Sequence, residues 1–406
     1  MTERRVDVAV IGGGIVGLGI AWTVARSGRT VAVIDPAPGT GATYAAAGML
    51  AAVSEFHYQE EGLLEAMLAS AQLYPEFIES LGAAETGYRT AATITIGADA
   101  ADRQALADLR AVQLTHGLSV ESLTIREARQ REPLLSPQLS SAFSIEQDHQ
   151  VDPRRLAARL QSSVAAIATA REWPNSHAIR QNAVELLHEH PSDTGSRVTG
   201  VALADGSTVL AGEVVVANGL AARELAGLPD GCTLPLRPVY GDILRLRVPE
   251  HLRPFLTSTV RGLVRGLPVY LVPRMDCTVV LGATQREDGS AGVSAGGVHQ
   301  LLRDAQVLVP AVAELELIEA TVRARPATPD NAPLLGRVAS GVDATGADVD
   351  IAGLIVATGF FRHGVLLTPM AAQHCLSLIE GSAGDRWARF RPDRFSPTTQ
   401  RRFDRA

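Results

Sequence analysis

Two short apolar runs near the start of the chain flank a stretch with helical periodicity. Residues 6–11 and 30–34 are almost continuously hydrophobic, as expected of strands buried on both faces of a parallel sheet. The stretch between them opens with clustered glycines and continues as a helix to about Ser27, where Gly28 stops it. The pattern predicts a strand–helix–strand unit with a glycine-rich turn at its first junction.

The rest of the chain alternates between helical and strand patterns, with no repeat of fixed period. Asp152-Pro153 predicts a helix start, because aspartate suits the N-cap and proline suits the first helical position. Residues 198–210 predict a hairpin that turns at Asp205-Gly206. Further helices are expected at 62–81, 102–116, 298–309 and 364–380, and further strands at 89–96, across the strand-rich region 234–325, and at 353–357.

Size and composition are those of a globular protein with two domains. The chain has 406 residues, of which 46% are hydrophobic and 20% are charged. Its 37 basic and 44 acidic residues give a net charge of −7, so no overall positive field attracts nucleic acid. Asp7 and several glycines interrupt the N-terminal stretch that resembles an export signal, and no later apolar run suits a membrane span. We expect a cytoplasmic protein without a membrane partner.

The three cysteines are scattered along the chain at Cys232, Cys277 and Cys375. They form no C-x-x-C pair and no cluster with histidine, so we expect neither a disulfide framework nor a metal site. Cysteines of this kind are usually small buried apolar residues. Their pattern indicates a reducing compartment.

The glycine-rich turn predicts a dinucleotide site. Gly12 permits the tight turn, Gly14 lets the backbone approach a pyrophosphate, and Gly17 lets the helix pack closely on the strand. The first N–H groups of the helix, at Ile15 and Val16, present partial positive charge to the phosphates.

An acidic residue ends the second strand of this unit. Asp35, followed by Pro36, lies 21 residues beyond Gly14, where an acid accepts hydrogen bonds from ribose hydroxyls and excludes a 2′-phosphate. Strand, glycines, helix, strand and acid together predict dinucleotide binding. They leave open whether the dinucleotide is FAD or NAD.

A run of small residues after Asp35 carries a family resemblance. Gly41-Ala42-Thr43 followed by Ala45-Ala46-Ala47-Gly48-Met49-Leu50 resembles the segment that lines FAD in the D-amino acid oxidase superfamily. It is most similar to the glycine oxidases linked to thiamine biosynthesis. Further segments resemble superfamily signatures in the same order, at 214–219, 270–274 with 282–284, 325–330 and 359–364.

The resemblance implies an α/β fold in which a β-rich α+β substrate domain is inserted into a discontinuous Rossmann-like FAD-binding domain. The FAD-binding domain is expected at 1–86, 148–232 and 325–406, and the substrate domain at 87–147 and 233–324. FAD is expected to bind noncovalently. Besides the residues of the glycine-rich unit, the resemblance assigns to the FAD site Ala42, Thr43, Ala47, Gly48, Met49, Val184, Gly219, Gly359, Phe361, Arg362, His363, Gly364, Val365 and Leu366.

The same resemblance implies the residues that bind substrate. Arg325, in the run Arg-Pro-Ala-Thr-Pro-Asp, matches the arginine that binds the substrate carboxylate, since a guanidinium donates two parallel hydrogen bonds to a carboxylate. Tyr270 matches a tyrosine whose hydroxyl meets that carboxylate, and Arg362 matches an arginine bordering substrate and flavin. The substrate pocket is expected to be completed by Met49, Glu55 and Gln285.

Three positions depart from the usual glycine oxidase pattern. Gln285 stands where several glycine oxidases have methionine, which makes the pocket more polar, and Phe360 replaces a common histidine. Arg323 stands where glycine is usual, on the same strand face as Arg325. We expect Arg323 to face solvent.

The resemblance implies oxidation of glycine, sarcosine or small D-amino acids. The α-hydrogen would leave as hydride to flavin N5, O2 would be reduced to H2O2, and the sequence identifies no general base. It also implies a homotetramer. Two alternatives are a D-amino acid dehydrogenase, which uses a quinone at a membrane, and a sarcosine oxidase, which attaches FAD through a cysteine in the loop that here reads Phe360-Phe361-Arg362-His363.

Arginines and aromatic residues alternate in the C-terminal tail, from Arg386-Trp387 to Arg405. Such a pattern can bind single-stranded nucleic acid. The segment 390–395 reads Phe-Arg-Pro-Asp-Arg-Phe, which resembles an ending common in the superfamily. We expect the tail to pack on the FAD-binding domain and not to bind nucleic acid.

Overall fold

The computed structural model describes residues 3–174, 178–190, 192–229, 232–342 and 348–396, which form two compact units. Unit 1 contains the described residues of 1–43, 157–238 and 325–406, and unit 2 contains those of 44–156 and 239–324. Each unit is assembled from separate stretches of the chain, in the manner of a discontinuous domain with insertions.

The chain passes from one unit to the other after Thr43, Leu156, Pro238 and Ala324. Segment 44–86 joins unit 2 because its backbone contacts residues of that unit. A Cβ atom on Gly48 would lie 2.0 Å from the Val151 carbonyl oxygen, and Arg274 donates to the Ala47 carbonyl.

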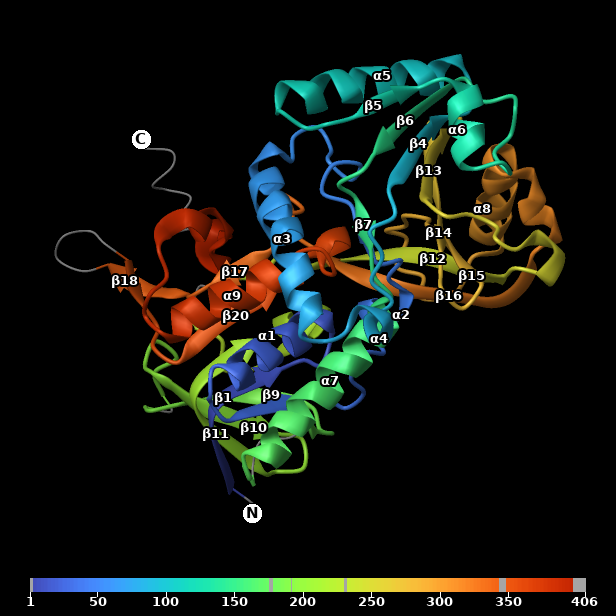
Figure 1. Cartoon of the computed structure of the whole chain (residues 1–406). Helices are drawn as coiled ribbons and strands as arrows, with labels where there is room; N and C mark the ends of the chain where they lie inside the picture. Colours follow the sequence, from blue (N-terminus) through green and yellow to red (C-terminus); the bar gives the residue numbers. More distant parts are fainter. Residues whose placement is uncertain (1–2, 175–177, 191, 230–231, 343–347, 397–406) are drawn as a thin grey trace. The chain divides into compact units, whose positions relative to one another are not determined.

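The core of unit 1 is an eight-stranded sheet in which five neighbouring strands run parallel, in the order β20-β11-β1-β2-β8 (Figure 1). Antiparallel β17 extends one edge, while β10 and β9 branch from β11. The strands are β1 (Glu3–Ile11), β2 (Val31–Ile34), β8 (Ala178–Ile179), β9 (Ala183–His188), β10 (Val198–Leu203), β11 (Thr208–Val216), β17 (Leu334–Gly336) and β20 (Leu354–Thr358), beside the separate pair β18 (Ala339–Val342) and β19 (Asp348–Asp350).

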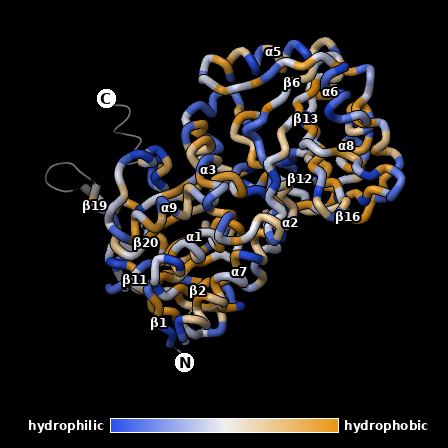
Figure 2. Tube along the Cα trace, viewed as in Figure 1, coloured by the Kyte–Doolittle hydropathy of each residue, from blue (hydrophilic) through white to orange (hydrophobic). Residues whose placement is uncertain are grey.

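Helices of unit 1 cover this sheet with apolar side chains. α1 (Ile15–Arg26) is buried along almost its whole length and packs beside α9 (Thr368–Ile379) (Figure 1). Figure 2 shows hydrophobic residues concentrated along α1, β1 and β2. The remaining helical segments are α7 (Pro153–Ala170), which begins in unit 2, and the 3₁₀ turns at Gly219–Glu224, Phe361–His363, Asp385–Phe390 and Pro392–Phe395.

Unit 2 is built on a second eight-stranded sheet, in the order β16-β12-β15-β14-β13-β4-β6-β5. One face packs against α8 (Ala295–Leu308) through a core that includes Leu244, Leu271 and Leu301. The strands are β4 (Thr93–Gly97), β5 (Glu121–Leu123), β6 (Ser141–Ile145), β12 (Arg237–Arg247), β13 (Thr259–Val264), β14 (Leu267–Pro273), β15 (Thr278–Gly282) and β16 (Glu316–Ala327).

Shorter elements complete unit 2. β3 (Met49–Leu50) pairs with β7 (His149–Gln150). The helical segments are α2 (Ala42–Ala45), which begins in unit 1, α3 (Glu61–Glu79), α4 (Ala83–Thr86), α5 (Ala100–Thr115), α6 (Ile125–Arg131), and the 3₁₀ turns at Glu250–Leu252 and Pro310–Glu314.

Several local predictions are confirmed, and others need correction. Asp152 caps α7 by accepting from the N–H groups of Arg154 and Arg155, and the β10–β11 hairpin turns at Gly206 with a φ of 80°. The predicted strand 89–96 is shorter: Arg89 makes only an isolated bridge with Gln150, and β4 begins at Thr93.

The helix predicted from Gly364 was also placed too early. A 3₁₀ turn over Phe361–His363 comes first, and α9 begins at Thr368. Pro369, which has no N–H, suits the first turn of a helix, so it marks the start of α9 more reliably than the glycine does.

Candidate cofactor and substrate site

The carboxyl ends of neighbouring parallel strands in unit 1 lie at one edge of the sheet. Ile11 pairs in register with Val216 of β11 and with Ile34 of β2, and β20 continues the sheet on the far side of β11. In open α/β sheets this edge is where ligands bind. The residues that directly follow these strand ends are Gly12, Asp35, Ala217 and Gly359.

The three motif glycines at this edge have different surroundings. A Cβ atom on Gly12 would lie 2.5 Å from the Ala217 carbonyl oxygen, and one on Gly17 would lie 2.0 Å from the Gly12 carbonyl oxygen. Gly12 also has a φ of 107°, which side chains rarely allow. At Gly14, by contrast, the nearest atom is Thr43 Oγ1 at 3.6 Å. The open position over Gly14 leaves room for a pyrophosphate against the backbone.

Two polar side chains hold the glycine-rich turn. Asp35 accepts from the Gly13 N–H at 2.6 Å and from the Ala37 N–H at 2.7 Å. Thr43 Oγ1 accepts from the Ile15 N–H at 2.9 Å. Gly14, at the N-cap of α1, has no side chain, and no acidic residue lies in the first turn. Because Thr43 already accepts from the Ile15 N–H, an anion would meet the other N–H groups of the first turn. The turn therefore fits the pyrophosphate of a dinucleotide.

The loop after β20 has an unusual backbone. Gly359 has a φ of 73° and Phe361, a bulky residue, has a φ of 48°. A Cβ atom on Gly359 would lie 2.7 Å from Thr328 Cγ2, and Thr358 Oγ1 donates to the Gly219 carbonyl at 3.0 Å. Strained backbone of this kind concentrates at functional sites. His363 is buried, and Arg362 lies with its guanidinium carbon 5.2 Å from the Phe361 ring centroid.

Arg325 lies close to this edge of the unit 1 sheet. It directly precedes Pro326 on β16, and Pro326 Cγ lies 3.9 Å from the position of a Cβ atom on Gly219. Arg325 is half-buried. The structure thus brings the predicted carboxylate-binding arginine near the loops that the resemblance assigns to FAD.

In unit 2, Tyr270 belongs to a row of residues that crosses the sheet on one face. Tyr270 of β14 pairs in register with Arg261 of β13 and with Gly282 of β15, and Gly282 pairs with Ile243 of β12. A Cβ atom on Gly282 would lie 2.3 Å from the Tyr270 hydroxyl oxygen. The glycine therefore leaves the space that the Tyr270 ring fills.

Arg261 is a residue of this row that the sequence patterns did not reveal. Its Nη1 atom lies 2.5 Å from Glu55 Oε1 and 3.7 Å from Met49 Sδ. Met49 packs with Tyr270 in one apolar cluster. The structure thus brings together Met49, Glu55 and Tyr270, which are all predicted pocket residues. The ion pair between Arg261 and Glu55 could be found only from the pairing of β13 with β14.

The Ala47-Gly48 backbone is held by a buried cation. Arg274 donates to the carbonyl oxygens of Ala47 and, at 2.7 Å, Val151. Burial lowers the pKa of Arg274 to about 10, so it stays charged at neutral pH. Gly48 has a φ of 70° and no room for a Cβ atom. The segment predicted to line FAD is therefore fixed in shape by its own unit.

Other predicted residues have less specific surroundings. Gln285 is exposed after the end of β15. Val184, on β9, is 42% exposed, and its carbonyl accepts from the Ala226 N–H. Arg323, which we expected in solvent, is half-buried: its guanidinium carbon lies 5.4 Å from the centroid of the Tyr44 ring, which shields it.

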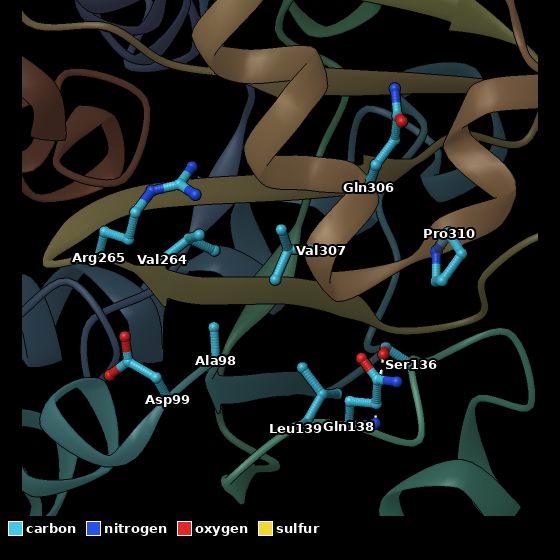
Figure 3. Close-up of a pocket in the computed structure, with 10 residues that line it drawn as sticks. All are labelled: Ala98, Asp99, Ser136, Gln138, Leu139, Val264, Arg265, Gln306, Val307 and Pro310. Atoms are coloured by element: carbon cyan, nitrogen blue, oxygen red, sulfur yellow. Dashed lines mark hydrogen bonds between the residues drawn. The ribbon is translucent and has the colours of Figure 1, made fainter.

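The pocket in Figure 3 lies elsewhere in unit 2 and has a volume of about 360 Å³. Its two charged side chains are already partnered: Asp99 accepts from N–H groups in the first turn of α5, and Arg265 pairs with Asp304. None of the residues predicted to bind FAD or substrate lines it. The lining residues are Ala98, Asp99, Ser136, Gln138, Leu139, Val264, Arg265, Gln306, Val307 and Pro310.

The described part of the C-terminal tail packs on unit 1. Trp387 and Phe390 are buried, and Arg394 pairs with Asp330 and donates to nearby carbonyls. The predicted packing is therefore confirmed as far as Ser396, and the tail's arginines beyond residue 396 lie outside the described residues. Of the cysteines, Cys375 is buried as expected, but Cys232 and Cys277 are half-buried.

Neither a membrane-crossing helix nor a metal cluster occurs in the described part of the chain. Within the described ranges, no helix has the length and hydrophobicity to cross a bilayer. The same ranges contain no group of three or more His, Cys, Asp or Glu side chains that could hold a metal ion.

Comparison with known proteins identifies the family. Residues 7–378 match the model of the DAO family, described as FAD dependent oxidoreductase. The chain belongs to this family, and it is an FAD-dependent oxidoreductase with the predicted α/β fold.

Individual relatives narrow the likeness. The chain is similar to a glycine oxidase of Geobacillus kaustophilus, with 33% identity over 93% of both chains. The crystal structure of glycine oxidase from that organism matches with a TM-score of 0.78 and 30% identity, covering 96% of this chain and 98% of the other. An iminodiacetate oxidase from Chelativorans sp. BNC1 matches with a TM-score of 0.78 and 26% identity, covering 93% and 96%. The predicted resemblance to glycine oxidases is confirmed.

Proposed function

We propose that this protein oxidises glycine or another small amino acid or amine at the carbon between its amino and carboxylate groups. Two relatives are named as oxidases of glycine and of iminodiacetate. Both compounds have an amine attached to a CH₂–COO⁻ group. The observation that carries the proposal is that Arg325 directly precedes Pro326, which lies beside Gly219 at the carboxyl-end edge of the unit 1 sheet. A guanidinium there supplies two parallel donors for a substrate carboxylate.

Each residue has a role that follows from its chemistry. Arg325 and Tyr270 bind the carboxylate and orient the substrate, so catalysis rests mainly on positioning. Arg362 borders the substrate, while Met49, Glu55 and Gln285 line its pocket. Bound noncovalently, FAD supplies the redox chemistry by accepting a hydride and passing electrons to O2, which gives H2O2.

The pyrophosphate and ribose contacts in the proposal follow the geometry of unit 1. Gly12, Gly14 and Gly17 with the N–H groups of α1 hold the pyrophosphate. Asp35, whose carboxylate already holds the turn, accepts from the ribose hydroxyls. The other FAD contacts are those of the small-residue segment, Val184, Gly219 and the loop after β20.

Experiments distinguish the proposed enzyme from two alternatives, one with a covalent link to FAD and one with a quinone as electron acceptor. A sarcosine oxidase-like covalent link needs a cysteine in the loop after β20, but Cys375 is buried in α9. Flavin released by acid precipitation of the protein supports noncovalent binding, and flavin retained in the pellet contradicts it. A dehydrogenase that uses a quinone would reduce an artificial quinone without forming peroxide.

The proposal also includes a homo-oligomer in the cytoplasm, which size-exclusion chromatography and cell fractionation test.

The central experiment measures peroxide formation with glycine, sarcosine, D-alanine and D-proline, wild type against Arg325→Ala and Arg325→Lys. KM should rise by roughly a hundredfold in Arg325→Ala, because a bidentate charged contact is lost. The flavin spectrum should not change. An unchanged KM would contradict the role of Arg325, and no turnover of any amino acid would contradict the proposed function.

A further inference from the structure

Three arginines of unit 2 gather around the Tyr44 ring. The guanidinium carbon of Arg154 lies 3.5 Å from the ring centroid, and that of Arg323 lies 5.4 Å from it. Arg154 Nε also donates to the Tyr44 carbonyl at 2.8 Å. Arg245 of β12 belongs to the same group. Burial lowers the pKa of its guanidinium, and the nearby charge of Arg154 lowers that pKa further.

Two carboxylates, those of Glu319 and Asp152, lie beside these arginines. Glu319 accepts from Arg154 Nη1 at 3.0 Å and from Nη2 at 2.6 Å. Asp152 directs its carboxylate to the first N–H groups of α7. A ligand bound among these arginines is expected to be an anion, and a carboxylate can accept two parallel hydrogen bonds from one guanidinium.

Arg245 lacks the acceptors that a buried guanidinium needs. It is 6% exposed, and its Nε and Nη2 atoms find no hydrogen-bond partner among the described residues. The nearest carboxylate oxygen, Glu319 Oε2, lies 3.8 Å from Nε, which is beyond hydrogen-bond range. Leaving buried donors unsatisfied is costly, so an acceptor supplied by a ligand would relieve the cost.

The arginine cluster adjoins the residues proposed to bind substrate. Arg245 lies two residues after Ile243 on β12, and Ile243 packs with Met49 and Tyr270 in one apolar cluster. Residues two apart on a strand face the same way and lie about 7 Å apart. Arg323 likewise lies two residues before Arg325 on β16. On β16, therefore, a second cationic position lies one step from Arg325, and on β12 the cation Arg245 lies one step from the apolar Ile243.

We propose that Arg245, with Arg154 and Arg323, binds a second carboxylate on the substrate, so that the preferred substrates are amino acids carrying two carboxylates. This inference rests on the proposed function and specifies its substrate class. The second carboxylate would supply the acceptor that Arg245 Nε and Nη2 lack, while the first carboxylate is bound as proposed.

The test uses substrate pairs that differ only in the second carboxylate. D-Aspartate is compared with D-asparagine, and N-(2-carboxyethyl)glycine with N-(2-carbamoylethyl)glycine, on holoenzyme with peroxide as the readout. In at least one pair the wild type should favour the dicarboxylate by about tenfold or more in kcat/KM, as expected for a charge-assisted contact. No preference in either pair, alongside turnover of glycine, would overturn the inference and leave the proposed function standing.

Variants assign the preference to the cluster. Arg245→Gln should remove most of the preference while changing kcat/KM for the amide substrates by less than about threefold. Arg247→Gln is the matched control, because Arg247 lies two residues further along β12 and is exposed. If Arg245→Gln does not fold, as judged by thermal melting, Arg323→Gln takes its place with the same expectation.

A binding measurement separates a substrate role from a cofactor role. Succinate, which is not oxidised, should perturb the flavin absorbance of the wild type and bind about tenfold more weakly to Arg245→Gln. A variant that loses FAD affinity while keeping the substrate preference would show that the arginines serve the cofactor, and it would overturn the inference.

Discussion

The Tyr270 ring lies over Gly282 of the neighbouring strand, where a Cβ atom would stand 2.3 Å from both Cζ and Oη of the tyrosine. The two residues are paired in register on β14 and β15. The absence of a side chain at Gly282 thus sets the position of the hydroxyl proposed to bind the substrate carboxylate.

Gly282→Ala should therefore impair substrate binding by displacing Tyr270. We expect KM for the best substrate to rise by roughly tenfold, close to the effect of Tyr270→Phe, because both changes cost one hydrogen bond to the carboxylate. Flavin content should be unchanged. Steady-state kinetics check this, and a Gly282→Ala enzyme with normal KM would show that the tyrosine hydroxyl does not meet substrate.

Two glycines of the nucleotide turn should respond differently to alanine. Gly12→Ala strains a backbone with φ 107° and meets the Ala217 carbonyl at 2.5 Å, so little folded protein is expected. Gly14→Ala meets only Thr43 Oγ1 at 3.6 Å, so the fold should survive while FAD affinity falls by roughly tenfold or more, because the Cβ atom occupies the space of the pyrophosphate.

Thermal melting and fluorescence titration with FAD measure the two effects separately. Gly384→Ala is the control, since nothing lies within 4 Å of its Cβ position. A Gly14→Ala protein that binds FAD with wild-type affinity would refute the assignment of the pyrophosphate to this turn.

Asp148 should make stability depend on pH. Its buried carboxylate accepts from the N–H groups of Val53 and Ser54, both at 3.1 Å, and burial raises its pKa from 3.8 to about 6. The folded state therefore binds this proton more tightly than the unfolded state does. The stability contributed is fully present below pH 3.8 and is lost as the pH rises to about 6.

Asp148→Asn removes this titration. As the pH rises from about 4 to about 7, the free energy of unfolding of the variant should increase relative to that of wild type by about 3 kcal/mol. Urea denaturation at a series of pH values measures the difference. Parallel pH profiles for the two proteins would contradict the raised pKa.

Arg394 should act as a structural residue of the tail. It pairs with Asp330 at 2.9 Å and donates to the carbonyls of Pro333 and Phe390. Arg394→Ala should lower the free energy of unfolding by about 2 kcal/mol, whereas Arg180→Ala, at an exposed position, should have little effect.

Single-stranded nucleic acid should not bind the wild type at low salt. Salt-dependent binding that Arg394→Ala abolishes would instead favour the nucleic-acid interpretation.

Local features of the chain were predictable because they depend on neighbours in sequence. The turn at Gly12, the acid at Asp35 and the start of α7 at Asp152-Pro153 follow from backbone conformation and capping, which a few adjacent residues decide. Arg323 was misjudged for the opposite reason. Its exposure depends on Tyr44, a residue far away in the sequence.

The sequence by itself thus determined the dinucleotide turn, the fold class through its resemblance, and the residues that match family motifs, such as Arg325 and Tyr270. Only the tertiary structure decided which charged side chains lie close together and which are buried. The pair Glu55–Arg261 and the unsatisfied guanidinium of Arg245 arise from pairing between strands and from burial. Hydrophobic patterns specify which face of a strand is buried, but the partner across the sheet depends on register, which distant parts of the chain set together.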